Sequence, residues 1–126
     1  MILETTFLID LFRGKDNATT KIRELEKKGV PIFSTSISVF EIIQGLKNPK
    51  EEAIAKEFFD SMTILTLDKN SAFLAGEIQK KLREKGQLID PEDAMIAGIS
   101  IANDKTLLTN NIKHFSRIKE LKSQPY

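Results

Sequence analysis

Acidic side chains occur at three separated points of the chain where folding could bring them together to hold a metal ion. Glu4 follows a short apolar run, Glu41 lies in the apolar middle of the chain, and Asp93 follows Asp90-Pro91. Carboxylate oxygens are the ligands that hard cations such as Mg²⁺ and Mn²⁺ prefer. Three carboxylates held together without a cation repel one another, so at least one should have a raised pKa, and a bound cation would remove that penalty.

The composition excludes several other kinds of active site. The chain of 126 residues has no cysteine, which rules out disulfides, thiolate metal sites and cysteine nucleophiles. Its single histidine, His114, cannot by itself form a histidine zinc site, and no Gly-x-Ser-x-Gly motif accompanies it. Oxygen ligands are what the sequence offers in number.

The overall balance of residues is that of an ordinary globular protein. Hydrophobic residues make up 40% and charged residues 29%, and the formal net charge of +1 does not indicate a particular partner. No stretch reaches the length of a membrane span, and the apolar start contains Glu4 and Asp10 without a basic leader. We therefore expect a cytoplasmic protein with no membrane contact.

The elements that must position the acids alternate along the chain. Short apolar runs predict strands at residues 1–3, 30–33, 62–67 and 106–108, and helical spacing predicts the segments between them to be helices. This alternation predicts a single α/β domain over residues 1–126. Its expected architecture is a three-layer sandwich in which a central, mainly parallel sheet of four or five strands is flanked by helices.

The helix at residues 91–102 is the element around which the fold should be organised. Asp90 is expected to cap it with its side chain, and Pro91 suits its first position. Only Gly98 and Ser100 interrupt the apolar run from residue 94 to residue 102, which predicts a helix buried on all sides. Asp93 lies in its first turn, where the helix dipole also favours a carboxylate.

In a parallel sheet, ligands bind beyond the carboxyl ends of the strands. Glu4 and the segment Thr109-Asn110-Asn111 directly follow two predicted strands, so they should reach the same crevice as Asp93 and Glu41. Each group also has a purely structural explanation: a helix N-terminus for Asp93, a turn for Glu4 and for residues 109–111, and a polar helix face for Glu41.

Other expectations concern packing and exposure. The apolar stripes predict that Phe40, Ile54 and Phe73 face the core. Asp10 is expected to be exposed, and residues 123–126 are expected to form a loose tail. His114 is expected to be a partly packed surface residue, and the basic cluster at residues 80–85 a solvated helix face.

Four segments, taken together, resemble the PIN domain, and in particular the small VapC-type toxins of prokaryotic toxin–antitoxin pairs. The resemblance covers nearly the whole chain, with the segments in the family's order and spacing. They are Met-Ile-Leu-Glu-Thr-Thr-Phe-Leu-Ile-Asp-Leu-Phe at residues 1–12, Ser-Ile-Ser-Val-Phe-Glu-Ile-Ile-Gln-Gly at 36–45, Asp-Ala-Met-Ile-Ala-Gly at 93–98 and Leu-Leu-Thr-Asn-Asn-Ile-Lys-His-Phe at 107–115.

The resemblance implies a Mg²⁺- or Mn²⁺-dependent ribonuclease, usually a homodimer, that a cognate antitoxin holds inactive. A water would attack phosphorus and leave a 5′-phosphate product, and lysines would steer the RNA backbone. The implied metal-holding residues are Glu4, Glu41, Asp93 and Asn111, the supporting hydroxyls are those of Thr6 and Thr109, and the expected RNA contacts are Lys47, Lys50 and Lys113.

Glu4 departs from the family, which usually has aspartate at this position. The extra methylene extends the carboxylate by about 1.5 Å, given ordinary bond lengths. A PIN-fold module that has lost catalysis and binds RNA or protein is therefore an alternative hypothesis. A phospho-accepting receiver domain is a third, although it would need a lysine after a late strand, and Thr109-Asn110-Asn111 contains none.

Overall fold

The computed structural model describes the whole chain, Met1–Tyr126, and confirms the predicted α/β architecture. Five short strands form one parallel sheet in the order β3-β2-β1-β4-β5. The strands are β1 (Ile2–Leu3), β2 (Phe33–Thr35), β3 (Thr63–Leu65), β4 (Leu107–Leu108) and β5 (Ser123–Gln124). The helices are α1 (Thr5–Phe12), α2 (Asp16–Lys27), α3 (Ser36–Gly45), α4 (Pro49–Asp60), α5 (Lys69–Glu84), α6 (Pro91–Ala102) and α7 (Ile112–Phe115).

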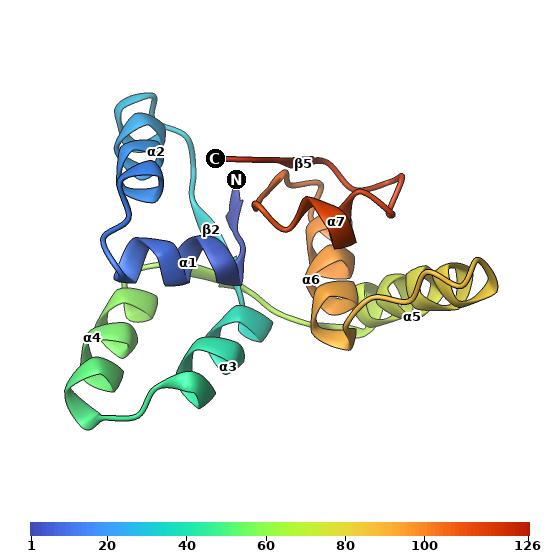
Figure 1. Cartoon of the computed structure of the whole chain (residues 1–126), viewed down its shortest axis with the longest axis horizontal. Coiled ribbons are helices and arrows are strands. Elements are labelled where there is room, and N and C mark those ends of the chain that lie inside the picture. The colour runs from blue at the N-terminus through green and yellow to red at the C-terminus, as the bar shows by residue number, and fades with distance from the viewer.

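The sheet separates two helical layers. Helices α1–α4 lie on one side and α5–α7 on the other (Figure 1). Successive side chains of a strand point to opposite faces, so Ile2 packs with the cluster under α5 and α6, and Leu3 with the cluster under α1–α4. Leu107 and Leu108 divide in the same way because they are in register with Ile2 and Leu3.

The strand order predicts a ligand crevice at the carboxyl ends of β1 and β4. From β1 the chain builds the sheet outward through β2 and β3, and it then returns to place β4 and β5 on the other side of β1. Such a reversal leaves an open crevice between the two central strands. Glu4 and Thr109 are the first residues after those strands, so the topology places both at this crevice.

Helix α6 is buried as predicted, and its contact with α5 depends on a missing side chain. At Gly98, a Cβ atom would lie 2.4 Å from the backbone oxygen of Ser71 and 2.9 Å from the backbone nitrogen of Ala75. The backbones of α5 and α6 therefore approach more closely than any other residue at position 98 would permit. This contact fixes α6, and with it Asp93, against the rest of the molecule.

Two local predictions about helix starts and strand ends were wrong in detail. Asp90 is the N-cap residue of α6, but its side chain makes no capping hydrogen bond. Strand β2 begins at Phe33, where the prediction ended it, because Ser34 and Thr35 are buried in the sheet. Thr35 then also caps α3, since its hydroxyl accepts a hydrogen bond from the Ser38 backbone N–H at 3.1 Å.

Several predictions about exposure were also wrong. Phe40, Ile54 and Phe73 are more than half exposed. The helices that carry them turn other residues toward the core instead. Asp10 is largely covered: its carboxylate accepts a hydrogen bond from the Tyr126 hydroxyl and pairs with Lys15. Residues 123–126 are not loose, since β5 pairs with β4.

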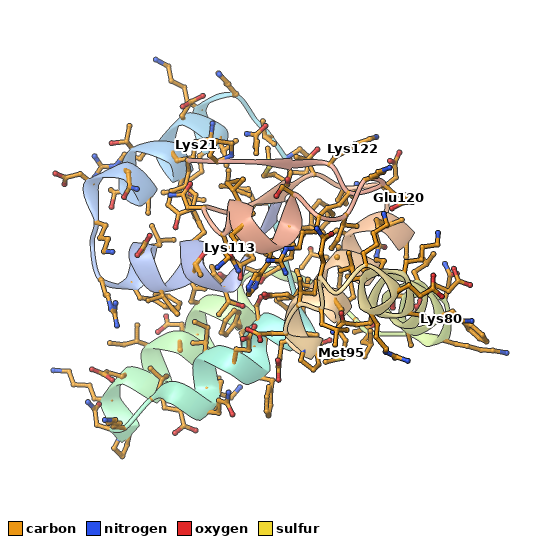
Figure 2. The ribbon with its side chains drawn as sticks, turned by 45° about the vertical axis from the view of Figure 1, so that its right-hand side comes forward. Lys21, Lys80, Met95, Lys113, Glu120 and Lys122 are labelled. Atoms are coloured by element: carbon orange, nitrogen blue, oxygen red, sulfur yellow. The ribbon has the colours of Figure 1, made fainter.

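The basic face at residues 80–85 is exposed as predicted, and Lys80 lies at the edge of the molecule (Figure 2). None of the helices has the length and apolar character needed to cross a membrane.

Candidate active site

Glu4 is buried at the crevice and held by hydroxyl and amide donors. Its Oε2 accepts hydrogen bonds from the Thr6 backbone N–H at 3.1 Å, from the Thr6 hydroxyl, and from the Thr109 hydroxyl at 2.9 Å. Only 2% of its surface is exposed. The longer side chain is therefore accommodated inside the site, with Thr6 and Thr109 both fixing its position.

Glu41 projects toward the same region from α3. Its Oε1 accepts a hydrogen bond from the Thr5 hydroxyl at 2.7 Å, and Thr5 in turn contacts the Ser38 hydroxyl at 2.9 Å. Thr5 is the residue after Glu4, so the same short segment supports both glutamates. Ser38 lies three residues before Glu41, on the same face of α3.

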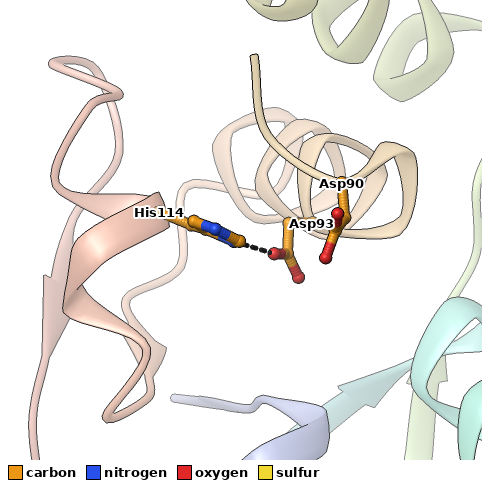
Figure 3. Close-up of side chains that lie close together, drawn as sticks. All are labelled: Asp90, Asp93 and His114. Atoms are coloured by element: carbon orange, nitrogen blue, oxygen red, sulfur yellow. Dashed lines mark hydrogen bonds and ion pairs between the residues drawn. The ribbon is translucent and has the colours of Figure 1, made fainter. Parts of the chain in front are cut away.

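Asp93 lies in the first turn of α6 and contacts two residues of the segment after β4. Its Oδ2 lies 2.8 Å from Nδ1 of His114 and accepts a hydrogen bond from the Asn111 side-chain amide at 3.4 Å. The carboxylates of Asp90 and Asp93 point to the same side of α6, and His114 faces Asp93 from α7 (Figure 3). One ligand atom from each of Asp90, Asp93 and His114 lies within 4.8 Å of the others.

The site acids influence one another electrostatically. Burial raises the pKa of Glu4, and the charge of Asp93 raises it further, against the hydrogen bonds from Thr6 and Thr109. Burial also raises the pKa of Glu41, again with a contribution from Asp93. The pKa of Asp93 is raised chiefly by burial, although the contact with His114 opposes this shift. Asp93 is thus the acid to which both glutamates are coupled.

Each of the three carboxylates has one oxygen bonded within the protein and one oxygen without a hydrogen bond. The oxygens without a hydrogen bond are Oε1 of Glu4, Oε2 of Glu41 and Oδ1 of Asp93. No buried side-chain oxygen lacks a partner, so these three atoms are open to solvent. Oxygen donors with raised pKa values suit a hard divalent ion, which would remove the repulsion among them.

The structure does not bring Glu4 and Glu41 into the 4.8 Å group formed by Asp90, Asp93 and His114. Mg²⁺ usually keeps several waters and binds through one or two carboxylates, so an ion held by Asp93 would not need direct bonds to both glutamates. The expected lysines are all exposed. Lys47 and Lys50 lie where α3 leads into α4, and Lys113 lies on α7, toward the middle of the view in Figure 2.

Sequence reasoning missed the role of His114, which it placed at the surface without a partner. His114 lies three residues after Asn111, and that spacing places both on one side of the short helix α7. This spacing was the available signal, but the partner of both residues, Asp93, lies on a different helix. Asp90 and Thr5 were missed as well, since a cap and a strand-to-helix turn explained them equally well.

The raised pKa of Glu4 predicts how stability depends on pH in the absence of divalent cations. A carboxyl group whose pKa is raised by folding stabilises the fold fully below its ordinary value of 4.5 and loses that contribution as pH rises through the raised pKa. In Glu4→Gln, position 4 cannot ionise. The difference in Tm, variant minus wild type, should therefore increase as pH rises from 4.5 to neutrality.

Thermal unfolding followed by circular dichroism in EDTA across this range measures the difference. Glu26→Gln, on an exposed face of α2, is the control for the substitution itself and should show no such trend. A Tm difference for Glu4→Gln that stays constant with pH would contradict the buried, ionisable Glu4 described here.

The comparison with known families agrees with this geometry. A family model described as the PIN domain matches residues 1–121. The chain therefore belongs to the PIN domain family.

Within that family the chain is similar to proteins named as VapC ribonucleases. It is 29% identical over 125 residues to "Ribonuclease VapC19" of Mycobacterium tuberculosis, covering 99% of this chain and 98% of that protein. It is 32% identical over 120 residues to "Ribonuclease VapC1" of Methanocaldococcus jannaschii, covering 95% and 82%. The crystal structure of VapBC2 from Rickettsia felis, bound to a promoter DNA fragment, superposes with a TM-score of 0.85 at 27% identity over 99% of this chain and 97% of that chain.

Proposed function

We propose that the chain is a divalent-metal-dependent endoribonuclease and the toxin of a toxin–antitoxin pair. The observation that carries the proposal is the set of carboxylates at one crevice, each with one oxygen held by the protein and one oxygen open. Similarity to proteins named as VapC ribonucleases supports RNA as the substrate. The buried and well-supported Glu4 favours an active site over a module that has lost catalysis.

The chain's own residues prepare this site for a phosphodiester. Glu4, Glu41 and Asp93 would hold Mg²⁺ or Mn²⁺, with Asn111 beside Asp93. When bound, the cation supplies Lewis acidity toward the phosphate and lowers the pKa of an attacking water. Thr6 and Thr109 fix the Glu4 carboxylate, and this support matters because small misplacements of reacting groups are costly.

Cleavage by water would leave a 5′-phosphate on the RNA product. The exposed amino groups of Lys47, Lys50 and Lys113 would neutralise RNA phosphates on either side of the crevice. The substrate would be met in the cytoplasm.

A groove next to the site suits the antitoxin. It has a volume of about 410 Å³, is lined mainly by apolar residues of α1, α3 and α4, and extends to Glu41. An antitoxin segment with an apolar face could occupy it and present a basic side chain to the acids, which would block cation binding.

We also propose that the protein is a homodimer, which sedimentation equilibrium would test.

Removal of metal gives the direct test of the nuclease. The purified chain, free of antitoxin, should cleave single-stranded RNA with Mn²⁺ or Mg²⁺, should stop in excess EDTA, and should recover when Mn²⁺ is added back. Product ends are mapped by sensitivity to a 5′-phosphate-dependent exonuclease. Absence of cleavage with either ion, or cleavage that EDTA does not affect, would refute the proposal and favour the binding module.

A further inference from the structure

Residues 123–126 pair with the segment that carries Thr109 and Asn111. Strand β5 pairs with β4, and the backbone N–H of Thr109 donates to the backbone oxygen of Gln124 at 3.0 Å. The backbone N–H of Tyr126 donates to the side-chain oxygen of Asn110 at 3.0 Å. Thus Asn110 is bonded to the last residue of the chain, while its neighbours are bonded to the site acids.

Those neighbours are the two residues that reach the acids. Thr109 donates to Glu4, and Asn111 donates its side-chain amide to Asp93. The Thr109 hydroxyl also accepts the backbone N–H of Asn111 at 3.0 Å. Movement of Asn110 would therefore displace contacts to two different acids.

The side chain of Tyr126 fixes the same segment to α1. Its ring packs edge-on against Phe7, with ring centroids 4.6 Å apart and an interplanar angle of 86°. Its hydroxyl donates to Asp10 at 2.6 Å. Burial and this bond raise the pKa of Tyr126, so the hydroxyl keeps its proton at neutral pH. Helix α1 begins directly after Glu4, so Tyr126 connects the elements that supply Glu4 and Asn111.

We propose that Tyr126 is a positioning residue of the active site, which sets the placement of residues 109–111 relative to Glu4 and Asp93. The proposal rests on the proposed function for its effect on cation binding, but not for the contacts themselves. Nothing in it requires Tyr126 to touch RNA or metal. Loss of the side chain should loosen the segment and weaken the cation site without removing any ligand.

The test compares Tyr126→Ala and Tyr126→Phe with Phe58→Ala. Phe58 is the matched control, because it is also a half-buried aromatic residue that packs edge-on against a phenylalanine of α1, Phe12, at 5.1 Å. The affinity for Mn²⁺ is measured by calorimetry well below Tm. Hydrogen exchange of the Asn111 backbone amide is measured by NMR in cation-free protein.

We expect Tyr126→Ala to weaken Mn²⁺ binding by about 10-fold or more, as for other residues that orient metal ligands, and to accelerate exchange at Asn111. Tyr126→Phe keeps the ring against Phe7 and loses only the hydroxyl, so its affinity should stay within about 3-fold of wild type, well inside the 10-fold expected for loss of an orienting residue. Phe58→Ala should lower Tm and change neither readout. If Tyr126→Ala does not fold, Asn110→Ala removes, from an exposed position, the acceptor of the Tyr126 backbone N–H, and it should likewise weaken Mn²⁺ binding and accelerate exchange at Asn111.

If Tyr126→Ala lowers Tm or accelerates exchange at Asn111 but leaves the affinity for Mn²⁺ unchanged, the positioning role is overturned. An equal loss of Mn²⁺ affinity in Phe58→Ala would also overturn it. If wild type binds Mn²⁺ and cleaves RNA while Tyr126→Ala does so equally well, the inference fails and the proposed function stands. If wild type binds no Mn²⁺, the proposed function fails. Exchange at Asn111 in Tyr126→Ala, compared with wild type, then tests the placement of residues 109–111: unchanged exchange overturns the inference, and faster exchange supports it.

Discussion

Asp93→Asn should reduce RNA cleavage by at least about 100-fold. Replacing residues that merely orient metal ligands already costs about 10- to 100-fold, so removing a charged ligand should cost more. Asparagine keeps the size of the side chain, so α6 should remain in place. Asp93 is the most sensitive position because the pKa values of both Glu4 and Glu41 respond to its charge. Single-turnover cleavage of a labelled RNA, together with calorimetric titration of Mn²⁺, measures the loss.

Glu92→Gln is the matched control for this experiment. Glu92 lies in the same first turn of α6 and carries the same charge, which adds to the raised pKa values of Glu41 and Asp93, but hydrogen bonds do not fix its carboxylate in the site. Its replacement should leave cleavage within about 3-fold of wild type, since it removes a partly screened charge and no ligand of the proposed cation. Equal losses in the two variants would reduce the role of Asp93 to general negative charge, and wild-type cleavage by Asp93→Asn would exclude it as a ligand.

Gly98→Ala should destabilise the fold strongly for so small a change. The new methyl group would meet backbone atoms of Ser71 and Ala75 that cannot rotate away, so α5 and α6 must separate. Such overpacking costs about 1–3 kcal/mol or more, which corresponds to a decrease in Tm of at least about 3 °C. Because α6 carries Asp93, cleavage should also decrease at temperatures where the variant is fully folded.

Gly76→Ala applies the same substitution where no atom obstructs it. Gly76 is exposed on α5, and its Cβ would meet nothing within 4 Å. Alanine in a helix interior is favoured over glycine by about 0.5–1 kcal/mol, so this variant should be more stable than wild type. Thermal unfolding of the two variants should therefore give shifts of opposite sign. A stable Gly98→Ala protein would show that α5 and α6 are not in close backbone contact.

The parts of the fold that the sequence predicted correctly are those that depend on local pattern. Apolar pairs bounded by polar residues gave β1 and β4, and the rule for parallel sheets then brought Glu4, Thr109 and Asp93 to one edge. That these residues act as metal ligands is a prediction, which the Mn²⁺ titration of Asp93→Asn tests.

The parts that it missed depend on partners distant in the chain. Strand β5 consists of Ser123 and Gln124, which have no apolar pattern, and it forms because β4 offers an unpaired edge. His114 has its partner 21 positions away, on α6. Phe73 is exposed although its spacing is helical, because periodicity identifies an apolar face and not what covers that face.

The hydrogen bond between Glu4 and Thr109 spans 105 positions of the chain, and it has a consequence for synthesis on the ribosome. Strands of two or three residues have no stability alone, so β1 must wait, exposed, for β4 to be translated. At about 5–20 residues per second, that interval lasts roughly 5–20 s. During this time the nascent chain has no assembled site. The contact between Glu4 and Thr109 can form only after Thr109 has left the exit tunnel, whereas α1, α3 and α4 emerge several seconds earlier.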